Sequence, residues 1–440
     1  MTKILFISLG CDKNLVDSET MMGMLRDRGY EFTDDENDAD VIIINTCGFI
    51  TSAKEESINT ILEMAEHKKD KLKALIATGC LAERYKDEIM KELPELDAVV
   101  GTTAFDTICD VVDDVLAHKG HNEFRDINRM CSPDSRRIIT TGGYYSYLKI
   151  AEGCDKRCTY CSIPLFKGKY RSTPMEKLVE EAEYLAGSGV RELILVAQET
   201  SVYGKDIYGE KRLPELLHRL CAVDGIEWIR ILYCYPEEIT DELIETIKTE
   251  PKICHYIDMP IQHASDRILK KMGRRTTNAD LRRIIGKLRE EIPDIALRTT
   301  LITGFPSETE EDVDILLDFV DEMDFDRLGV FTYSPEENTP AASMDGQIDE
   351  ETKLTRRDKL MELQQEVSAD KAESLVGKRL EVIIEGKAAD ENVYVGRSYM
   401  DAPGVDGYVF IETDEELMSG DFAFVKITKA LEYDLIGELD

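Results

Sequence analysis

Three cysteines near the middle of the chain place the strongest constraint on its structure. They are Cys154, Cys158 and Cys161, a C-x-x-x-C-x-x-C array directly after a strand-like run at Tyr144–Ala151. Three thiolates on one short loop can hold three corners of a four-iron, four-sulfur cluster, and such clusters usually take four cysteines. The fourth iron would be left open, as a substrate-activating cluster requires. The array therefore predicts an iron–sulfur site at the end of a strand.

A structural zinc site is the other interpretation of this array, because cysteine clusters also bind zinc. Zinc sites favour C-x-x-C motifs in pairs, and the spacing here is different. The eleven cysteines of the chain are an odd number, which argues against a disulfide framework and predicts a reducing compartment. No apolar run approaches the length of a membrane span, and Met1–Leu9 lacks the layout of a signal peptide. We therefore expect a cytoplasmic protein with iron–sulfur chemistry and no membrane segment.

Residues 1–120 alternate between strand and helix patterns, which predicts a doubly wound parallel sheet. We expect the strands at Ile4–Leu9, Val41–Ile44, Ala74–Ala77 and Ala98–Val100, and the helices at Leu15–Arg28, Ser52–Glu66, Glu83–Leu93 and Phe105–Ala117. Ser52, with Glu55 three residues later, predicts a capping box at the start of the second helix. The polar residues 121–143 that follow predict an interdomain linker.

Three further cysteines lie just beyond the carboxyl ends of three successive strands of this sheet. They are Cys11, Cys47 and Cys80. Because parallel strands end at the same edge, where open α/β sheets bind their ligands, these cysteines should converge in space. The alternative is three unrelated buried thiols, which are common in proteins. Their matching positions favour a second site with three cysteines.

The motifs around these six cysteines resemble the methylthiotransferase family of radical S-adenosylmethionine (SAM) enzymes. The radical-SAM signature is the spacing at Cys154 with an aromatic residue before the last cysteine, here Tyr160. The family motifs are S-L-G-C-D-K-N-L-V-D-S-E at Ser8–Glu19, N-T-C at Asn45–Cys47 and T-G-C at Thr78–Cys80, and the match runs along the full chain. One residue departs from the pattern, because members that act on a ribosomal protein usually have proline where this chain has Asp12.

The resemblance implies two four-iron clusters with different tasks. Cys154, Cys158 and Cys161 would hold the cluster that binds SAM and cleaves it to a 5′-deoxyadenosyl radical. Cys11, Cys47 and Cys80 would hold an auxiliary cluster that provides the sulfur, which a second SAM methylates. No side chain is expected to act as a general acid or base.

The strand–helix alternation resumes over residues 144–340, with six strand-like runs. They are Tyr144–Ala151, Glu192–Ala197, Trp228–Tyr233, His255–Met259, Ala296–Thr303 and Leu328–Tyr333. Six units fall short of the eight in a closed barrel and match the open (β/α)6 barrel that the resemblance implies. Barrel chemistry takes place at the carboxyl ends of the strands, and the Cys154 array lies there.

Residues at other strand ends are candidates for SAM binding. By resemblance these are Gln198 and Glu199 after the second strand, Gln262 after the fourth, and Thr300, Ile302 and Gly304 in L-I-T-G-F-P at the fifth, together with Tyr160. Each is also compatible with an ordinary cap or loop anchor, since polar residues often end strands and begin helices.

The C-terminal part combines a helix with a small β domain. Residues 341–375 predict a linking helix, with an apolar stripe at Leu354, Leu360, Met361, Leu363 and Val367 that should pack on a neighbouring domain. Residues 376–440 contain five short strand patterns, which suit a small antiparallel barrel of the OB type and resemble the TRAM domain of the family. From Leu375 onward there are 15 acidic and 6 basic residues, a net charge of −9.

This negative charge favours one branch of the family over the other. The whole chain carries a net charge of −35, and an RNA substrate would need several phosphates neutralised. A basic ribosomal protein would instead be attracted to acids such as Asp401, Asp406, Glu412, Asp414, Glu415 and Glu416. We therefore predict methylthiolation of an aspartate β-carbon in small-subunit ribosomal protein number twelve, free or in the ribosome. The reaction would use two SAM, two clusters and a low-potential electron donor. The alternatives are a methylthiotransferase of tRNA adenosines (N6-isopentenyl or threonylcarbamoyl) and a non-catalytic iron–sulfur sensor.

Overall fold

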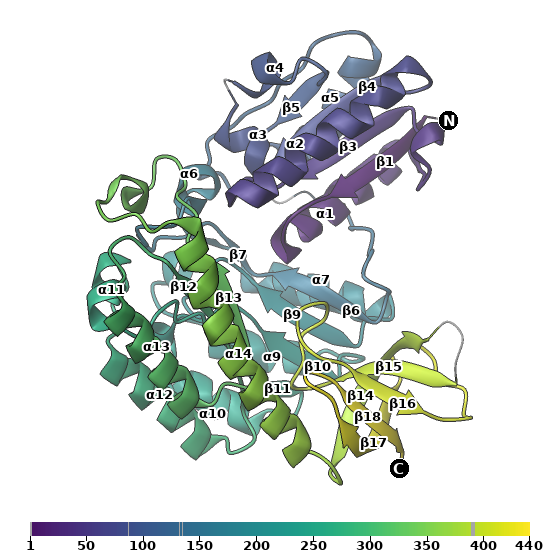
Figure 1. The fold of residues 1–440 in the computed structure, drawn as a ribbon. Coiled ribbons are helices and arrows are strands. Elements are labelled where there is room, and N and C mark those ends of the chain that lie inside the picture. The colour runs from purple at the N-terminus through teal and green to yellow at the C-terminus, as the bar shows by residue number, and fades with distance from the viewer. Residues whose placement is uncertain (1, 87, 132, 134, 389–391) are drawn as a thin grey trace.

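The chain folds into three units that follow one another in sequence (Figure 1). The computed structural model describes residues 2–86, 88–131, 133, 135–388 and 392–440. An N-terminal α/β domain lies at one end of the molecule, a central α/β barrel forms the body, and a small β-barrel at the C-terminus lies against the central one. No helix in the described residues is long and apolar enough to cross a membrane.

The N-terminal domain is a parallel sheet covered by helices on both faces. Its strands are β1 (Lys3–Ser8), β2 (Glu31–Phe32), β3 (Val41–Thr46), β4 (Ala74–Gly79) and β5 (Ala98–Val100), in the order β2-β1-β3-β4-β5. α1 (Asp12–Arg28) and α5 (Ile108–Leu116) pack on one face. α2 (Thr51–Ala65), α3 (Cys80–Arg84) and α4 (Ile89–Glu92) cover the other. Every residue of β3 is buried, as its β-branched run predicts for a central parallel strand, so the doubly wound prediction is confirmed.

Two local predictions in this domain are wrong. The second helix begins at Thr51, and extended Ile50 occupies its N-cap position without a side-chain cap. Ser52 therefore lies inside the first turn and cannot form the predicted capping box. The helix predicted at Glu83–Leu93 is two short helices, because α3 starts at Cys80 directly after β4 and ends at Arg84, before Tyr85, whose backbone is not helical.

The central unit is the predicted open six-stranded barrel. All of its paired strands run parallel, in the order β6-β9-β10-β11-β12-β13, with β6 and β13 at the edges. The strands are β6 (Tyr145–Lys149), β9 (Glu192–Val196), β10 (Trp228–Ile231), β11 (Ile253–Asp258), β12 (Ala296–Thr303) and β13 (Arg327–Thr332). The helices between them are α7 (Met175–Gly187), α9 (Leu213–Cys221), α10 (Asp241–Thr249), α12 (Asn278–Glu291) and α13 (Glu310–Met323). Both α12 and α13 begin with a complete capping box.

Several short strands and helices lie between the main strands and helices of the barrel. They are β7 (Ala151–Glu152), which pairs with β8 (Arg171–Ser172), and the helices α6 (Ile163–Lys167), α8 (Lys205–Tyr208) and α11 (Asp266–Lys271). The end of the predicted linker contacts the N-terminal domain, because buried Arg137 forms a 2.7 Å ion pair with buried Glu19 of α1. Arg137 also pairs with Glu181 of α7 at 3.0 Å and donates to Tyr147 O of β6, so what the sequence predicts as a linker is also a contact between domains.

The long helix α14 (Glu350–Ser374) spans the outside of the central barrel. The predicted apolar stripe is confirmed in part, because Leu360 is buried in the barrel core and Met361 and Leu363 pack against it, whereas Leu354 is exposed. Most of the fully buried side chains of the helix are polar. Lys353 Nζ donates to Tyr333 O at 2.8 Å, and Gln364 Nε2 donates to Phe325 O at 2.9 Å. The helix thus covers barrel backbone groups that apolar side chains could not satisfy.

The C-terminal unit is a closed barrel with the strand order β14-β15-β16-β18-β17. Its strands are β14 (Arg379–Lys387), β15 (Val393–Ser398), β16 (Val409–Glu412), β17 (Phe422–Ala430) and β18 (Leu435–Leu439). The pairs are antiparallel except that β16 and β18 pair in parallel, which closes the barrel. The small OB-like barrel predicted from the sequence is confirmed.

Buried ion pairs attach this barrel to the central one. Fully buried Glu192 of β9 accepts from Arg230 Nε at 2.8 Å and from Arg397 Nη2 at 2.6 Å. Asp401 pairs with Arg327, and Asp406 Oδ1 lies 3.3 Å from Arg298 Nε. Asp401 and Asp406 are thus taken up by the domain interface, so the expectation that they attract a separate basic protein is wrong for these two residues.

Candidate active site

The three N-terminal cysteines gather at one edge of the sheet, as their positions after the strands predict. Cys11 precedes α1, Cys47 follows β3, and Cys80 opens α3 directly after β4. A Cβ added at Gly10 would lie 2.8 Å from Cys47 Cβ, so the Cys11 loop packs directly on Cys47. Cys47 and Cys80 are buried and Cys11 is exposed. Burial raises the pKa of the Cys80 thiol well above its ordinary value, and the neighbouring Cys11 and Cys47 add to this rise.

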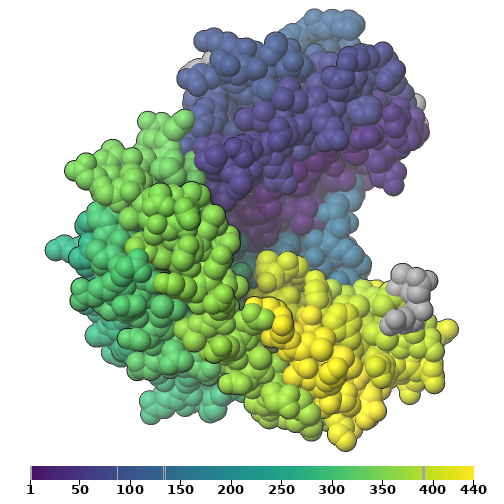
Figure 2. Space-filling view, viewed as in Figure 1, coloured from purple at the N-terminus to yellow at the C-terminus, as the bar shows by residue number. Residues whose placement is uncertain are grey.

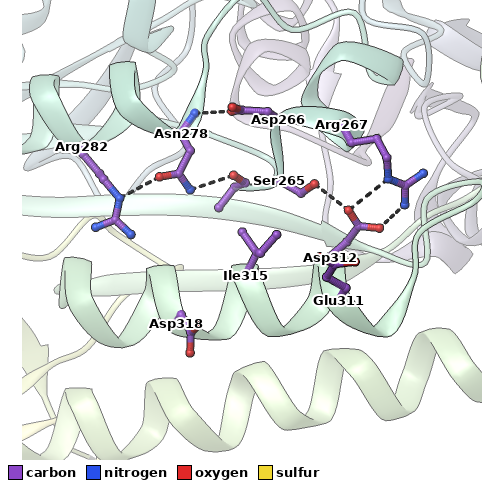
Figure 3. A pocket seen from close by; sticks show the side chains of 10 residues that line it. Ser265, Asp266, Arg267, Asn278, Arg282, Glu311, Asp312, Ile315 and Asp318 are labelled. Carbon is purple, nitrogen blue, oxygen red and sulfur yellow. Dashed lines mark hydrogen bonds and ion pairs between the residues drawn. The ribbon is translucent and has the colours of Figure 1, made fainter.

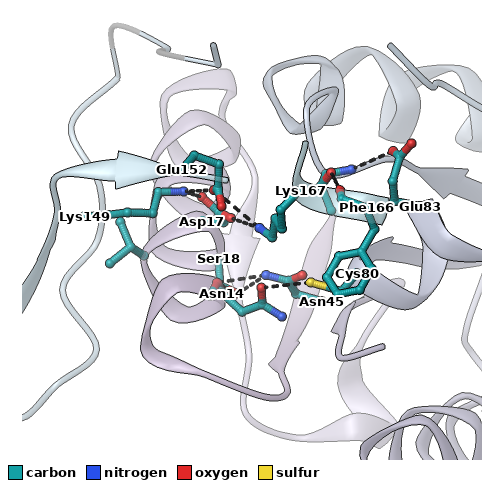
Figure 4. Close-up of polar contacts among 12 residues, drawn as sticks. Asn14, Asp17, Ser18, Asn45, Cys80, Glu83, Lys149, Glu152, Phe166 and Lys167 are labelled. Carbon is teal, nitrogen blue, oxygen red and sulfur yellow. Dashed lines mark hydrogen bonds and ion pairs between the residues drawn. The ribbon is translucent and has the colours of Figure 1, made fainter. Parts of the chain in front are cut away.

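Asn14 holds the three cysteine loops in place. Its Nδ2 donates to Leu9 O at 3.2 Å and to Thr46 O at 3.1 Å, the residues just before the Cys11 and Cys47 loops. Its Oδ1 accepts from Cys80 Sγ at 3.6 Å (Figure 4). Sequence reasoning assigned no role to Asn14, although its place three residues after Cys11 on the first helical turn was a usable signal.

A buried cluster of charges connects this edge to the central barrel (Figure 4). Lys167 Nζ lies 3.5 Å from Asp17 Oδ2 and 3.4 Å from Glu152 Oε2, and Lys149 pairs with the same two acids. Asp17 belongs to α1, and the other three residues belong to the barrel. Although burial opposes it, Glu152 holds the pKa of Lys167 well above its usual value, with smaller contributions from Cys80, Asp17 and Cys11, so the ammonium lies within electrostatic reach of the N-terminal thiols. No pattern in the sequence indicates this cluster.

The second triplet lies on the loop after β7, at the carboxyl ends of the barrel strands. Cys154 N donates to Gly168 O at 3.1 Å, and Gly153 has φ +79° with Lys169 O only 2.1 Å from where a Cβ would lie. Glycine is therefore required before Cys154. Burial raises the pKa of Cys154 to about 12, with a contribution from Cys158. Burial also raises the pKa of the Cys161 thiol, and Cys158 and Cys154 add to this rise. The three thiols therefore lie close together.

The donor set of each triplet fits an iron–sulfur cluster. Soft thiolates are the ligands that such clusters take. Thiols with raised pKa values stay protonated unless a metal centre replaces the proton. No group of three His, Cys, Asp or Glu side chains in the described residues is spaced to hold a single metal ion.

Glu199 and Gln198, which follow β9, present unused polar atoms beside the second triplet. Glu199 Oε1 accepts from Ser201 Oγ and from Tyr235 N, whereas its buried Oε2 accepts no hydrogen bond among the described residues and lies 3.8 Å from Lys156 Nζ. Burial raises the pKa of Glu199 to about 7. Gln198 Nε2 donates to Glu152 Oε1 at 2.8 Å, and its buried Oε1 is also without a described partner. Free acceptors at this strand end fit a ligand with an amino group.

The other predicted SAM residues lie around the end of β12. Gln262 has φ +72°, and its backbone pairs with β12 through Gln262 N to Thr300 O and Ile302 N to Gln262 O. Thr300 and Ile302 lie on the same half-buried face of β12. Tyr160 and Ile302 pack against one apolar cluster. Gly304 has φ +71°, and Lys353 Cγ of α14 lies 2.2 Å from the place of a Cβ, so only glycine fits under the helix.

Two residues that sequence reasoning missed adjoin Cys158. Tyr235 Oη lies 3.5 Å from Cys158 Sγ, and the Arg274 guanidinium carbon lies 4.2 Å from the centre of the Tyr235 ring. Arg274 is buried, and its Nε and Nη1 have no hydrogen-bond partner among the described residues. A cavity of about 130 Å³ is lined by Cys158, Tyr235 and Arg274, among others. Unpaired guanidinium donors beside this cavity fit an anionic group such as a carboxylate.

A separate groove of about 530 Å³ lies on the outside of the barrel and contains no cysteine (Figure 3). Several of its polar side chains bond to one another or to backbone. Ser265 Oγ donates to Asp312 Oδ1 at 2.6 Å, Asn278 Nδ2 donates to Ala264 O at 2.9 Å, and Arg282 Nε donates to Asn278 Oδ1 at 2.7 Å. These contacts hold neighbouring helices and loops of the barrel together. The candidate site therefore lies at the strand ends and not in this groove.

Comparisons with known structures agree with this fold. The radical S-adenosylmethionine methyltransferase TsrM from Kitasatospora setae, solved with cobalamin and a 4Fe-4S cluster, aligns with a TM-score of 0.57 at 14% identity. That alignment covers 86% of this chain and 76% of TsrM. The cobalamin-dependent radical enzyme OxsB aligns with a TM-score of 0.54, over 83% of this chain and 56% of OxsB. At such low identity these matches establish the fold alone.

Sequence comparisons are far more specific. Family profiles match at residues 3–101 (Uncharacterized protein family UPF0004), 148–320 (Radical SAM superfamily) and 376–439 (TRAM domain). The ribosomal protein uS12 methylthiotransferase RimO of Lachnoclostridium phytofermentans is 63% identical over 99% of both chains. RimO of Acetivibrio thermocellus is 52% identical over 99% of this chain and 98% of its own, and RimO of Clostridioides difficile is 51% identical over 100% and 99%. The chain therefore belongs to the RimO family of radical-SAM methylthiotransferases.

Proposed function

We propose that this protein is a radical-SAM methylthiotransferase that inserts a methylthio group at the β-carbon of an aspartate in ribosomal protein uS12. The observation that carries this proposal is the presence of two thiol triplets, one at the strand ends of each α/β domain. The segment after β10 links them, because Tyr233 reaches the N-terminal triplet loop and Tyr235 reaches Cys158. The relatives named uS12 methylthiotransferases support the same substrate.

The cofactors are SAM and two four-iron clusters. We assign Cys154, Cys158 and Cys161 to the cluster that binds SAM, and Cys11, Cys47 and Cys80 to the auxiliary cluster. When bound, these cofactors supply hydrogen-atom abstraction, a sulfur atom and a methyl group. They are needed because the C–H bond at an aspartate β-carbon is not readily deprotonated by a side-chain base.

The chain's own residues would bind and orient SAM. Oε2 of Glu199, which accepts no hydrogen bond among the described residues and lies 3.8 Å from the ammonium of Lys156, would accept one from the amino group of its methionine part, with Gln198 beside it. The unpaired donors of Arg274 would bind the methionine carboxylate. The remaining candidates, Tyr160, Gln262, Thr300, Ile302 and Gly304, would line the adenosine end. The packing of Lys353 over Gly304 would keep that turn fixed.

The surroundings of the site suit a large basic substrate. Figure 2 shows a hollow between the N-terminal domain, in purple, and the C-terminal barrel, in yellow. Glu412, Asp414, Glu415 and Glu416 on that barrel are exposed, and their charge would attract ribosomal protein uS12. We place the reaction in the cytoplasm, on uS12 either free or in the ribosome, with a low-potential electron donor as a further partner.

A direct assay tests this function. Anaerobically reconstituted protein is incubated with SAM, a strong reductant and either purified uS12 or total tRNA from a strain that lacks the enzyme, and both substrates are analysed by mass spectrometry. We expect a methylthio group on a uS12 aspartate and none on tRNA. A methylthio group on a tRNA adenosine would show that the protein belongs to the tRNA-modifying branch. A protein that does not cleave SAM would instead be a non-catalytic iron–sulfur sensor. The matched control is the Cys154→Ala, Cys158→Ala, Cys161→Ala variant.

A further inference from the structure

Asp12 and Lys13, the two residues after Cys11, form a compact polar contact with Tyr233 of the central barrel. Lys13 Nζ lies 3.2 Å from Asp12 Oδ1 and 3.5 Å from the centre of the Tyr233 ring. Tyr233 Oη donates to the same Asp12 oxygen at 3.1 Å. One carboxylate oxygen is therefore held by an ammonium and a phenol hydroxyl that come from two different domains.

This contact is buried and incomplete. Lys13 is 6% exposed, and Asp12 Oδ2 is buried without a hydrogen-bond partner among the described residues. Buried carboxylate oxygens normally have partners. One oxygen of the Asp12 carboxylate therefore has two partners, and the other has none among the described residues.

The backbone at Tyr233 is held in an unusual conformation. Its φ is +62°, a value that side chains of this size rarely adopt and that proteins keep mainly at functional sites. Tyr233 N donates to Asp258 Oδ2 at 3.0 Å, which helps to fix this geometry. Two residues later, Tyr235 Oη contacts Cys158. The contact of Lys13 with Tyr233 thus lies on the segment that joins the two thiol triplets.

We propose that Lys13 Nζ and Tyr233 Oη bind the side-chain carboxylate of the substrate aspartate, and that Asp12 occupies their site until the substrate enters. The inference rests on the proposed function, since it takes an aspartate as the substrate. The group that Lys13 and Tyr233 already hold is itself an aspartate carboxylate. An ammonium and a hydroxyl together prefer a carboxylate to a neutral amide. Because the β-carbon is bonded directly to that carboxylate, holding the carboxylate places the reacting carbon beside the Cys11 loop.

The test compares two peptides that carry the modified loop of uS12, one with the target aspartate and one with asparagine in its place. The wild-type enzyme should favour the aspartate peptide in kcat/KM by on the order of 100-fold, as for a charge-assisted contact in a buried site. Lys13→Met should lower kcat/KM for the aspartate peptide by a similar factor and bring the ratio of the two peptides close to one. Lys13→Arg should restore part of the preference. Tyr233→Phe, which removes a single hydroxyl, should reduce the ratio by about 10-fold.

The Asp12→Asn variant provides a second test, because it should improve binding of the aspartate peptide where the Lys13 and Tyr233 variants weaken it. If Asp12 competes with the substrate for Lys13, removing its charge should lower KM for the aspartate peptide. Lys371→Met is the matched control, because Lys371 is likewise a lysine held by carboxylates, those of Asp324 and Asp326, but it lies on α14 and outside the loops that carry the two triplets. Its aspartate-to-asparagine ratio should equal that of the wild type.

Two results would overturn the inference. If Lys13→Met and Tyr233→Phe slow both peptides equally, the residues have only a structural role between the domains. If Asp12→Asn raises KM, Asp12 is not a competitor. A wild-type enzyme that modifies neither uS12 nor the aspartate peptide would instead refute the proposed function itself, and the two failures are thereby distinguished.

Discussion

Tyr233 and Tyr235 lie two residues apart after β10, and their hydroxyls reach the two different thiol triplets. Tyr233 Oη donates to Asp12, next to Cys11, whereas Tyr235 Oη lies 3.5 Å from Cys158 Sγ. Cys234 between them is fully buried. A single short segment of barrel backbone therefore fixes the relative position of the two sites. Together with the ion pairs around Asp17 and Glu19, it holds the two domains in one arrangement, as a reaction shared between two clusters requires.

The first prediction concerns iron content. Two triplets should give about eight irons per chain after anaerobic reconstitution, four in each cluster. Replacing Cys154, Cys158 and Cys161 by alanine should halve the iron and abolish SAM cleavage. Iron and 5′-deoxyadenosine are measured on the same samples. The Cys221→Ala variant, which changes a thiol on α9 outside both triplets, is the control and should keep its full iron. An unchanged iron content in the triple variant would contradict the assignment.

The second prediction separates the two clusters. Replacing Cys11, Cys47 and Cys80 by alanine should stop sulfur insertion, while SAM cleavage continues at the other triplet. Asn14→Ala should have a weaker effect in the same direction, because Asn14 holds all three loops by hydrogen bonds. The readouts are methylthiolated uS12 and 5′-deoxyadenosine. Normal product from the triple variant would rule out the sulfur-donor role.

Much of this arrangement could be predicted from the sequence, because it depends on local patterns. The strands before Cys11, Cys47 and Cys80 are short β-branched or apolar runs, and parallel strands bring their ends to one edge. The roles of Tyr235 and Arg274 could not be predicted, since a loop tyrosine and a loop arginine have no periodic signal. The burial of Asp401 in an ion pair could not be predicted for a related reason. Its acidic neighbours suggest a solvated surface, whereas Arg327, which pairs with it, lies 74 residues away in sequence.

The third prediction concerns pH. Burial raises the pKa of Glu199 from its ordinary 4.5 to about 7, so its carboxylate is ionised only above about pH 7. SAM affinity should therefore increase as the pH rises through 7, because an ionised carboxylate accepts the hydrogen bond from an amino group more strongly. Glu199→Gln should bind SAM more weakly and with little dependence on pH in this range. Calorimetry across a pH series measures both.

The raised pKa of Glu199 also affects the free energy of unfolding, which should fall as the pH rises, whereas the SAM affinity should increase. Between pH 4.5 and 7 the folded protein binds this proton more tightly than the unfolded chain does, so Glu199 lowers the free energy of unfolding as the pH rises through this window. In Glu199→Gln that contribution should be absent. Denaturant unfolding of the two proteins without SAM, at pH 5 and pH 7.5, compares them directly. A wild-type protein whose SAM affinity does not change around pH 7 would argue against contact between Glu199 and SAM.

The fourth prediction concerns the attachment of the C-terminal barrel. Glu192→Gln removes the negative charge that fully buried Arg230 and Arg397 share. Breaking a buried ion pair on one side typically costs about 3–5 kcal/mol, because an uncompensated charge remains. The barrel should therefore undock at lower denaturant concentration, as followed by limited proteolysis after α14. Glu227→Gln is the control, since its 3.3 Å pair with Arg191 is exposed and should contribute less than about 1 kcal/mol. Equal effects of the two changes would contradict the docking role.

The last prediction concerns the acids that remain exposed on the C-terminal barrel. Replacing Glu412, Asp414, Glu415 and Glu416 by lysine should lower the association rate with purified uS12 by about 10-fold or more at low salt. The difference should shrink as salt rises, because the screening length is about 10 Å at 0.1 M. Asp401 and Asp406 are left unchanged, since they are buried in ion pairs.

The control makes the same charge change on the outer helices of the central barrel, at exposed Glu242, Glu245, Glu290 and Asp314. It alters the net charge equally, so a similar loss in both variants would mean that overall charge, and not this surface, attracts uS12. Stopped-flow binding across a salt series measures the rates, with bulk tRNA as the competing ligand. Tight tRNA binding by the wild type without measurable affinity for uS12 would transfer the substrate assignment to the tRNA branch, because the acidic surface would then have no basic partner to attract.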